Sequence, residues 1–225
     1  MLKPKRKILS QEIEHDPFIE TLFSIKQHFN FHKKIYFRSI AAFIIILLII
    51  SFLLRSQSTN SSNASNTLNK AMVFMSQKDN LNAMIFLQEA NDKYSNTDAG
   101  LDASYYLGKI HFDREDYILS KSYLKEYINK GSNKLLLGAS CQALANIYTI
   151  SDELENAIKY QRLQLKYINS NIDKAYANIN IAKLSFNMGD TLSAKILIEQ
   201  VIKENSENFK IIQLAEQANG EILAK

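Results

Sequence analysis

Two histidines near the N-terminus have the spacing of a metal-binding pair. His28 and His32 are four residues apart, so on a helix they would share one face and could ligate one zinc ion. A protein zinc site needs at least three protein ligands, and no third ligand accompanies them. We therefore interpret the histidines as a surface pair and expect no bound metal.

Other catalytic signatures are missing from the sequence. The single cysteine, Cys141, allows neither a Cys-x-x-Cys pair nor an internal disulfide, and we interpret it as a small packing residue. The chain has no Gly-rich phosphate loop, no His-Glu-x-x-His and no Gly-x-Ser-x-Gly motif. Residues 39–225 hold nineteen basic and nineteen acidic residues, a balance that argues against nucleic-acid binding. We expect a protein that is not an enzyme and that holds no cofactor.

Three kinds of residue recur every 37 positions along the C-terminal two-thirds of the chain. A small residue is preceded by another small residue twelve positions earlier and by an acidic residue four positions earlier. The three sets are Ala83, Ser120, Ala157 and Ala194; Ala71, Gly108, Ala145 and Ala182; and Asp79, Asp116, Glu153 and Asp190. A period between 20 and 50 residues indicates a solenoid of stacked units.

Each unit has the pattern of a helical hairpin. Apolar residues recur at spacings of three and four on both sides of the acid, which is a helical period. The acid lies where the second helix begins and can cap its free N–H groups. The small residues lie mid-helix, where two crossing helices approach most closely. We therefore expect Ala157→Leu to cost about 1–3 kcal/mol by overpacking and Gln161→Leu to be nearly neutral.

The later units resemble the tetratricopeptide repeat (TPR). The residues that carry the resemblance are Leu107, Gly108, Asp116, Tyr117, Ser120 and Leu124 in the second unit, Leu144, Ala145, Tyr148, Leu154 and Ala157 in the third, and Ile181, Ala182, Phe186, Gly189, Asp190 and Ala194 in the fourth. The resemblance covers residues 68–206. It departs from the family pattern in its period of 37 rather than 34 residues and in lacking the Pro that commonly ends a repeat, and the first unit has Lys70 where Leu is usual. An apolar segment at 208–223 is expected to cap the last hairpin.

An apolar run precedes the repeats. Residues 39–54 carry no charge, and twelve of the sixteen are Ile, Leu or Phe, which is worth about −6 kcal/mol on an insertion scale. We predict a transmembrane helix at 39–55; a buried core helix and a cleaved signal peptide are the alternatives. The sequence thus predicts an all-α protein with an N-terminal transmembrane helix, a TPR-like α-solenoid of about four hairpins within residues 68–225, and a C-terminal capping helix.

Basic residues predict the orientation of this span. Four of them lie shortly before it, namely Lys26, Lys33, Lys34 and Arg38, whereas only Arg55 and Lys70 follow closely. Residues 1–38 have a net charge of +4 and the remainder is neutral. The positive-inside rule predicts a cytoplasmic N-terminus and extracytoplasmic repeats.

The segments that flank the span differ in character. Residues 1–38 are expected to form a cytoplasmic tail, disordered up to residue 16 and then helical from Pro17. Its helix would be amphipathic, with an apolar face that either lies on the membrane surface or docks a partner, formed by Phe18, Leu22, Ile25 and Phe29. Residues 56–67, rich in Ser and Asn, are expected to form a flexible linker.

The resemblance to TPR proteins implies a concave groove lined by the first helix of each unit. Family positions carried onto this chain predict the protein-binding residues Met72, Tyr105, Lys109, Phe112, Asn146, Ile179, Lys183 and Phe186. Each could instead pack between units. The mixture of aromatic, amide and lysine groups suits a peptide or extended protein segment.

The layout of tail, span, spacer and repeats resembles the membrane-tethered ancillary subunit of the bacterial SecYEG translocon. That resemblance implies a single-pass protein of the bacterial inner membrane, with repeats in the periplasm and a scaffold or chaperone-like role. Its partners would be translocon subunits and exported proteins. Two alternatives are an envelope-assembly or cell-division scaffold and a cytosol-facing membrane-anchored receptor.

Overall fold

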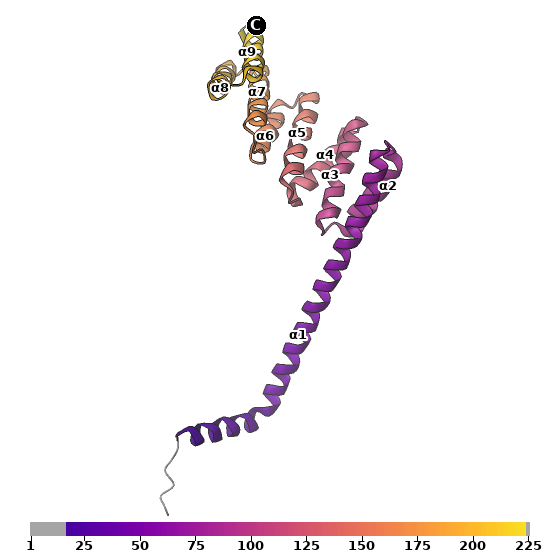
Figure 1. The fold of residues 1–225 in the computed structure, drawn as a ribbon, viewed down its shortest axis with the longest axis vertical. Helices are drawn as coiled ribbons and strands as arrows, with labels where there is room; N and C mark the ends of the chain where they lie inside the picture. The colour runs from indigo at the N-terminus through magenta and orange to yellow at the C-terminus, as the bar shows by residue number, and fades with distance from the viewer. Residues whose placement is uncertain (1–16, 224–225) are drawn as a thin grey trace, which may run out of the picture. The chain divides into compact units, whose positions relative to one another are not determined.

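The computed structural model describes residues 17–223, and this part of the chain contains helices and no strand. The expectation of an all-α protein is confirmed. The basic tail segment and its predicted disorder up to residue 16 lie outside the described residues. The helices are α1 (Pro17–Ser76), α2 (Asn80–Tyr94), α3 (Asp98–Asp113), α4 (Tyr117–Lys130), α5 (Lys134–Ile150), α6 (Leu154–Gln164), α7 (Asn171–Asn187), α8 (Thr191–Glu204) and α9 (Phe209–Leu223) (Figure 1).

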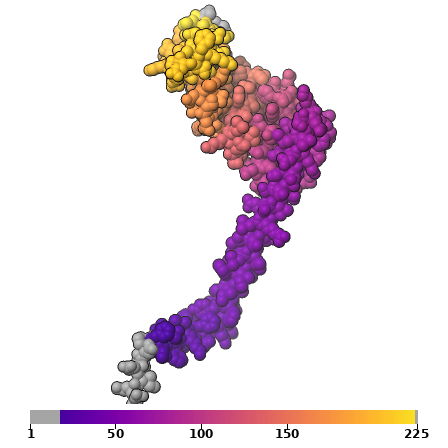
Figure 2. All heavy atoms as spheres, viewed as in Figure 1, coloured from indigo at the N-terminus to yellow at the C-terminus, as the bar shows by residue number. Residues whose placement is uncertain are grey.

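The chain divides into two compact units, residues 1–56 and residues 57–225. In the second unit the end of α1 and α2 form the first hairpin, and α3–α4, α5–α6 and α7–α8 form the next three. Each hairpin packs on the next through its neighbouring helices, so the four stack in chain order, as Figure 2 shows by colour. The predicted TPR-like solenoid is confirmed.

The small residues lie where the helices of a hairpin cross. Ala71, Ala83, Ala157 and their counterparts are buried. A Cβ added to Gly108 would lie 2.8 Å from the Leu124 side chain, closer than carbon atoms pack. The Ser120 hydroxyl donates a hydrogen bond of 2.8 Å to the Gly108 carbonyl at the same crossing. The recurrence of small residues every 37 positions therefore reflects the close approach of the two helix backbones in each hairpin.

The turn inside each hairpin repeats at the same period. The residue before the acid has a left-handed backbone in all four turns, with φ of 59° at Lys78, 61° at Glu115, 57° at Asp152 and 88° at Gly189. Its N–H bonds the carbonyl three residues back, and the N–H of the acid bonds the carbonyl five residues back. This pair of bonds is the Schellman motif that ends a helix.

The acids then cap the second helices. Asp79, Asp116 and Asp190 each accept a hydrogen bond from a backbone N–H three residues later. Glu153 makes no such bond; its carboxylate accepts from the Asn156 side chain instead. The longer side chain at this position therefore leaves the cap of α6 incomplete.

Aromatic pairs connect the two helices of the first three hairpins. Stacked rings with centroids 5.4–5.6 Å apart join Phe74 to Phe86, His111 to Tyr123 and Tyr148 to Tyr160, all in one register. In the fourth hairpin the same positions hold Ser185 and Leu197, so the stack ends there.

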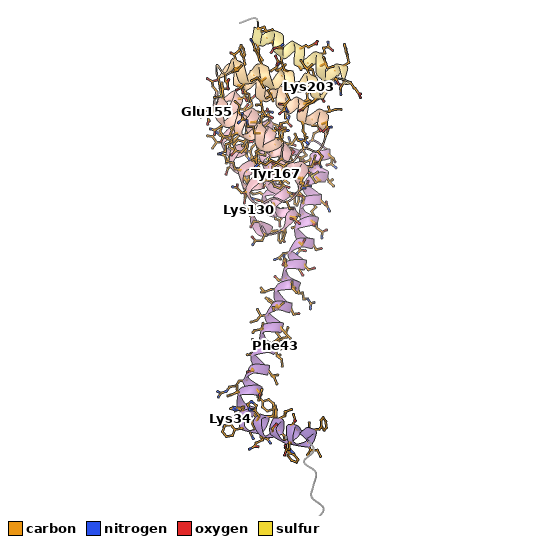
Figure 3. All side chains as sticks on the ribbon, turned by 90° about the vertical axis from the view of Figure 1, so that its left-hand side faces the viewer. Lys34, Phe43, Lys130, Glu155, Tyr167 and Lys203 are labelled. Atoms are coloured by element: carbon orange, nitrogen blue, oxygen red, sulfur yellow. The ribbon has the colours of Figure 1, made fainter. Side chains whose placement is uncertain are left out.

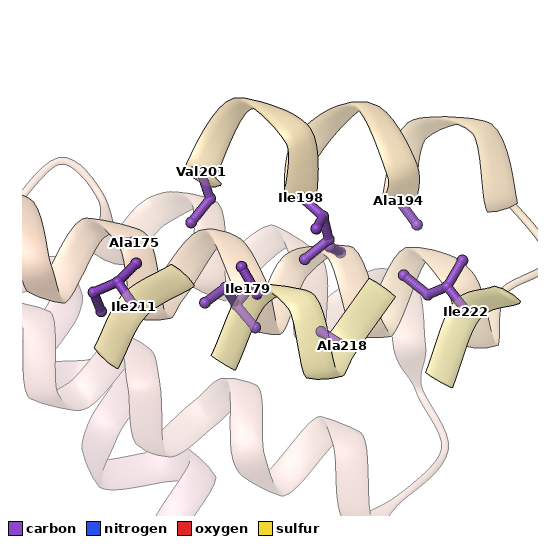
Figure 4. Packing of buried hydrophobic residues seen from close by; sticks show 10 residues of the cluster. Ala175, Ile179, Ala194, Ile198, Val201, Ile211, Ala218 and Ile222 are labelled. Atoms are coloured by element: carbon purple, nitrogen blue, oxygen red, sulfur yellow. The ribbon is translucent and has the colours of Figure 1, made fainter. Parts of the chain in front are cut away.

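The two ends of the array are closed in different ways. Lys70 replaces the usual Leu in the first helix, which has no hairpin before it, and its Nζ lies 5.9 Å from the Phe86 ring centroid. At the other end α9 packs on both α7 and α8. Figure 4 shows the resulting cluster of Ala175, Ile179, Ala194, Ile198, Val201, Ile211, Ala218 and Ile222. The predicted capping helix is confirmed.

Residues 56–67 are helical, so the expected flexible linker is wrong for this structure. They continue α1 without a break, and Ala64 is fully buried. Ser65 and Thr67 donate hydrogen bonds to carbonyls four residues back. Only nucleation of a helix is expensive, so a polar segment between two helical stretches can propagate at little cost.

The N-terminal part of α1 begins at Pro17, as predicted, and includes the residues of the expected amphipathic tail. Its apolar face is exposed at Phe18, Leu22, Ile25 and Phe29. An 18-residue window of α1 has a mean hydropathy of 2.7, and none of it is buried in the protein. The side chain of Phe43, within this apolar stretch, is 60% exposed (Figure 3). Within the described residues this stretch is therefore not packed against other parts of the protein.

Candidate functional site

A pocket of about 250 Å³ lies between α3 and α5. It brings together four of the eight residues that the repeat register predicts for the groove, namely Tyr105, Lys109, Phe112 and Asn146. Its other lining residues are Asp113, Leu124, Ala139, Gln142 and Ala143.

A larger pocket of about 670 Å³ adjoins it between α5 and α7. The two share Ala139 and Gln142, so they form one groove along the first helices of the second, third and fourth hairpins. The larger pocket is lined by Lys134, Leu135, Gly138, Ala139, Gln142, Gln164, Tyr167, Ile168, Asn169, Ser170, Asp173, Tyr176, Ala177 and Asn180. The predicted groove contained none of these residues.

The repeat register could have indicated part of this lining. Gln142 stands 37 residues after Tyr105, and Tyr176 stands 37 residues after Ala139. Tyr167, Ile168 and Asn169 lie in the connection from α6 to α7, which no helical register describes.

The aromatic residues of the smaller pocket also pack against their neighbours. Tyr105 is half-buried, and its ring centroid lies 5.0 Å from that of Tyr106 and 5.9 Å from that of Tyr127. The Phe112 ring contacts Tyr117 at 6.0 Å. Burial raises the pKa of the Tyr105 phenol. These rings are therefore fixed walls, whereas Lys109 and Asn146 are exposed at the rim.

A partly buried hydrogen bond lies behind the Tyr105 wall of the smaller pocket. The Tyr127 hydroxyl donates a 2.9 Å hydrogen bond to the Asp102 carboxylate. Burial raises the pKa of both groups, and the hydrogen bond from Tyr127 opposes the shift at Asp102. Because the Tyr127 ring contacts Tyr105, this bond orients the pocket wall.

The fourth hairpin does not offer the predicted groove residues. Ile179 is wrong as a groove contact, because it is 5% exposed and belongs to the cluster under α9. Lys183 forms an ion pair of 3.0 Å with Glu221 of α9, and Phe186 packs against the same cluster. The physical reason is the capping helix, which covers α7 where the preceding first helices are open.

Met72 lies outside both pockets. Its side chain is 37% exposed on the first helix of the first hairpin. Its role in binding stays a prediction.

Metal-binding and reactive side chains are not grouped in the described part of the chain. Between residues 17 and 223 no three His, Cys, Asp or Glu side chains lie close enough to hold a metal ion. The rings of His28 and His32 are 4.6 Å apart, and no third ligand accompanies them among residues 17–223. Cys141 is buried, and burial raises the pKa of its thiol to about 12.

Comparison with known proteins supports the repeat assignment. Residues 138–171 match the tetratricopeptide repeat family. The fold is similar to the TPR-like repeats of a Podosopora anserina protein described as a kinesin light chain, at a TM-score of 0.54 and 14% identity, covering 72% of this chain and 89% of that one. A variant of the same protein matches equally, with 88% of its chain covered. No curated protein matches this chain.

Proposed function

We propose that this protein is a membrane-anchored scaffold whose groove holds polypeptide partners. The observation that carries the proposal is the continuous groove at Ala139 and Gln142, formed by two adjoining pockets. Aromatic and aliphatic walls suit the side chains of an extended segment, and carboxamides suit its peptide groups. TPR-like solenoids present concave surfaces of this kind to other proteins.

Anchoring by α1 is the second part of the proposal. Its apolar stretch around Phe43 is exposed in the protein, and a lipid bilayer would remove that surface from water. The excess of basic residues before the stretch supports a cytoplasmic N-terminus and extracytoplasmic repeats. We propose a single-pass protein of a bacterial inner membrane on this basis.

The third part concerns the setting of the scaffold. The order of tail, span and repeats resembles the ancillary subunit of the SecYEG translocon, and a groove open to extended chains would suit emerging envelope proteins. We therefore propose a chaperone-like role beside the translocon.

Site-specific photocrosslinking in intact membranes tests the groove. A photoreactive residue at Lys109, on the rim, should form adducts with translocon subunits or exported proteins. The same residue at Ile85, which is 62% exposed on α2 and lines neither pocket, is the matched control. Equal adducts from both positions, or none from Lys109, would contradict the proposal.

Two further experiments separate the alternatives. Deleting residues 1–36 should abolish co-purification with the translocon, whereas an envelope-assembly or cell-division scaffold would keep its partners. A reporter that is active only outside the cytoplasm, fused after Lys225, should be active. A silent fusion in an inserted protein would instead favour a cytosol-facing receptor.

A further inference from the structure

The groove has almost no charge at its centre. Helix α5, which floors both pockets, carries one charged residue in seventeen, Lys134 at its first position. The other charged lining residues lie toward the flanks, as Lys109 and Asp113 on α3 and as Asp173 on α7. The α3 flank thus has one positive and one negative group and the α7 flank has one negative group, whereas α5 beyond Lys134 has no charge.

The central face of α5 combines small and carboxamide side chains. Ala139 and Ala143 leave room for a backbone to approach closely, and Gln142 and Asn146 are exposed one helical turn apart. A carboxamide offers both a donor and an acceptor, which is the pair that a peptide group needs. This surface can therefore hold a main chain whatever its side chains are.

The larger pocket provides an apolar seat beside this face. Leu135 is 78% exposed there, and Tyr167 and Tyr176 are half-buried walls of the same pocket. Exposed apolar surface in a concave site favours an aliphatic or aromatic side chain of the ligand.

Resting on the proposed function, we infer that the groove selects an uncharged, extended polypeptide segment rather than a charged motif or chain terminus. A carboxylate or ammonium group laid over α5 would lose hydration without gaining a partner, which is unfavourable. Main-chain hydrogen bonds to Gln142 and Asn146, with an apolar side chain against Leu135, leave no buried charge. Affinity should then depend little on salt, since no ion pair contributes.

Binding of defined peptides to the full chain in detergent micelles tests this inference. The probe is a short acetylated and amidated peptide of Ser, Thr and Val, labelled with an uncharged fluorophore and followed by anisotropy. Matched probes carry two Asp or two Lys residues at the centre. The neutral probe should bind at least about tenfold more tightly than either, with a Kd unchanged between about 50 mM and about 500 mM salt.

A negative charge placed on the central face of α5 should reverse the preference for the neutral probe over the Lys probe. Gln142→Glu should weaken the neutral probe by about tenfold and strengthen the Lys probe. Gln213→Glu, on the exposed surface of α9 and outside both pockets, is the control and should change neither. Tighter, salt-sensitive binding of a charged probe to the unaltered chain would overturn the inference and leave the scaffold function standing. Failure to bind any of the three probes would overturn both the inference and the proposed scaffold function.

Discussion

The same substitution at two glycines should shift stability in opposite directions. Gly189 lies in the turn after α7 in a left-handed conformation with φ of 88°, whereas Gly220 lies in α9 with an ordinary helical backbone. A Cβ added at either glycine would meet no atom within 4 Å. Packing is therefore the same for both substitutions, and the backbone conformation alone decides whether alanine raises or lowers the stability.

The magnitudes follow from that conformation. A left-handed backbone costs an L-residue roughly 1–2 kcal/mol, and replacing glycine recovers roughly 0.5–1 kcal/mol by restricting the unfolded chain. Gly189→Ala should therefore lower the free energy of unfolding by about 1 kcal/mol. Gly220→Ala should raise it by roughly 0.5–1 kcal/mol, because alanine favours the helix.

Urea titration of the full chain in mild detergent, followed by far-UV circular dichroism, measures both changes. The slope with urea should be the same for both variants and the unaltered chain, so the midpoints report stability. Glu115→Gly, at the equivalent turn of the second hairpin, should raise the midpoint because φ there is 61°. Midpoint shifts of the same sign for Gly189→Ala and Gly220→Ala would refute the assignment of a left-handed turn position that recurs in each hairpin.

Four further predictions concern the repeat register and its caps. Ala157→Leu should lower the free energy of unfolding by about 1–3 kcal/mol in urea, since Ala157 is fully buried, and an unchanged midpoint would argue against close helix crossing. Gln161→Leu should change it by less than about 1 kcal/mol, because Gln161 is buried with its Oε1 unpaired and leucine removes this unsatisfied group. Glu153→Asp should raise it by roughly 0.5–1 kcal/mol by completing the cap of α6, and a loss would show that the geometry there rejects a shorter acid. Hydrogen bonds from Ser193 lower the pKa of Asp190, so this carboxylate stabilises the fold at pH values above its unfolded pKa, and the stabilisation is lost as the pH falls through the folded pKa. Below about pH 4 the melting temperature of Asp190→Asn should therefore depend less on pH than that of the unaltered chain. An identical pH dependence of the two would exclude the cap.

The repeat architecture could be predicted from the sequence because its constraints fix residue types. Close crossing favours glycine, alanine or serine, and the cap position favours an acid, so these positions recur visibly at 37 residues. The left-handed turns were missed because three of the four positions hold Lys78, Glu115 and Asp152, which share no obvious type. Their conformation is imposed by the hairpin geometry around them.

The groove could be predicted only in part. Tyr105 and Asn146 follow from family positions, but the burial of Ile179 depends on where α9 docks, which no local pattern states. The polar composition of residues 56–67 likewise did not reveal their helix, because the helical segments on either side favour its propagation.

Hydrogen exchange of the full chain in membranes, with and without the neutral peptide, tests the central claim most directly. A polypeptide held in the groove should slow amide exchange in residues 138–146 of α5, which lines both pockets, and leave the outward-facing part of α8 around Ile196 unchanged. Protection confined to α8, or spread evenly over all hairpins, would contradict a scaffold that binds its partners through this groove.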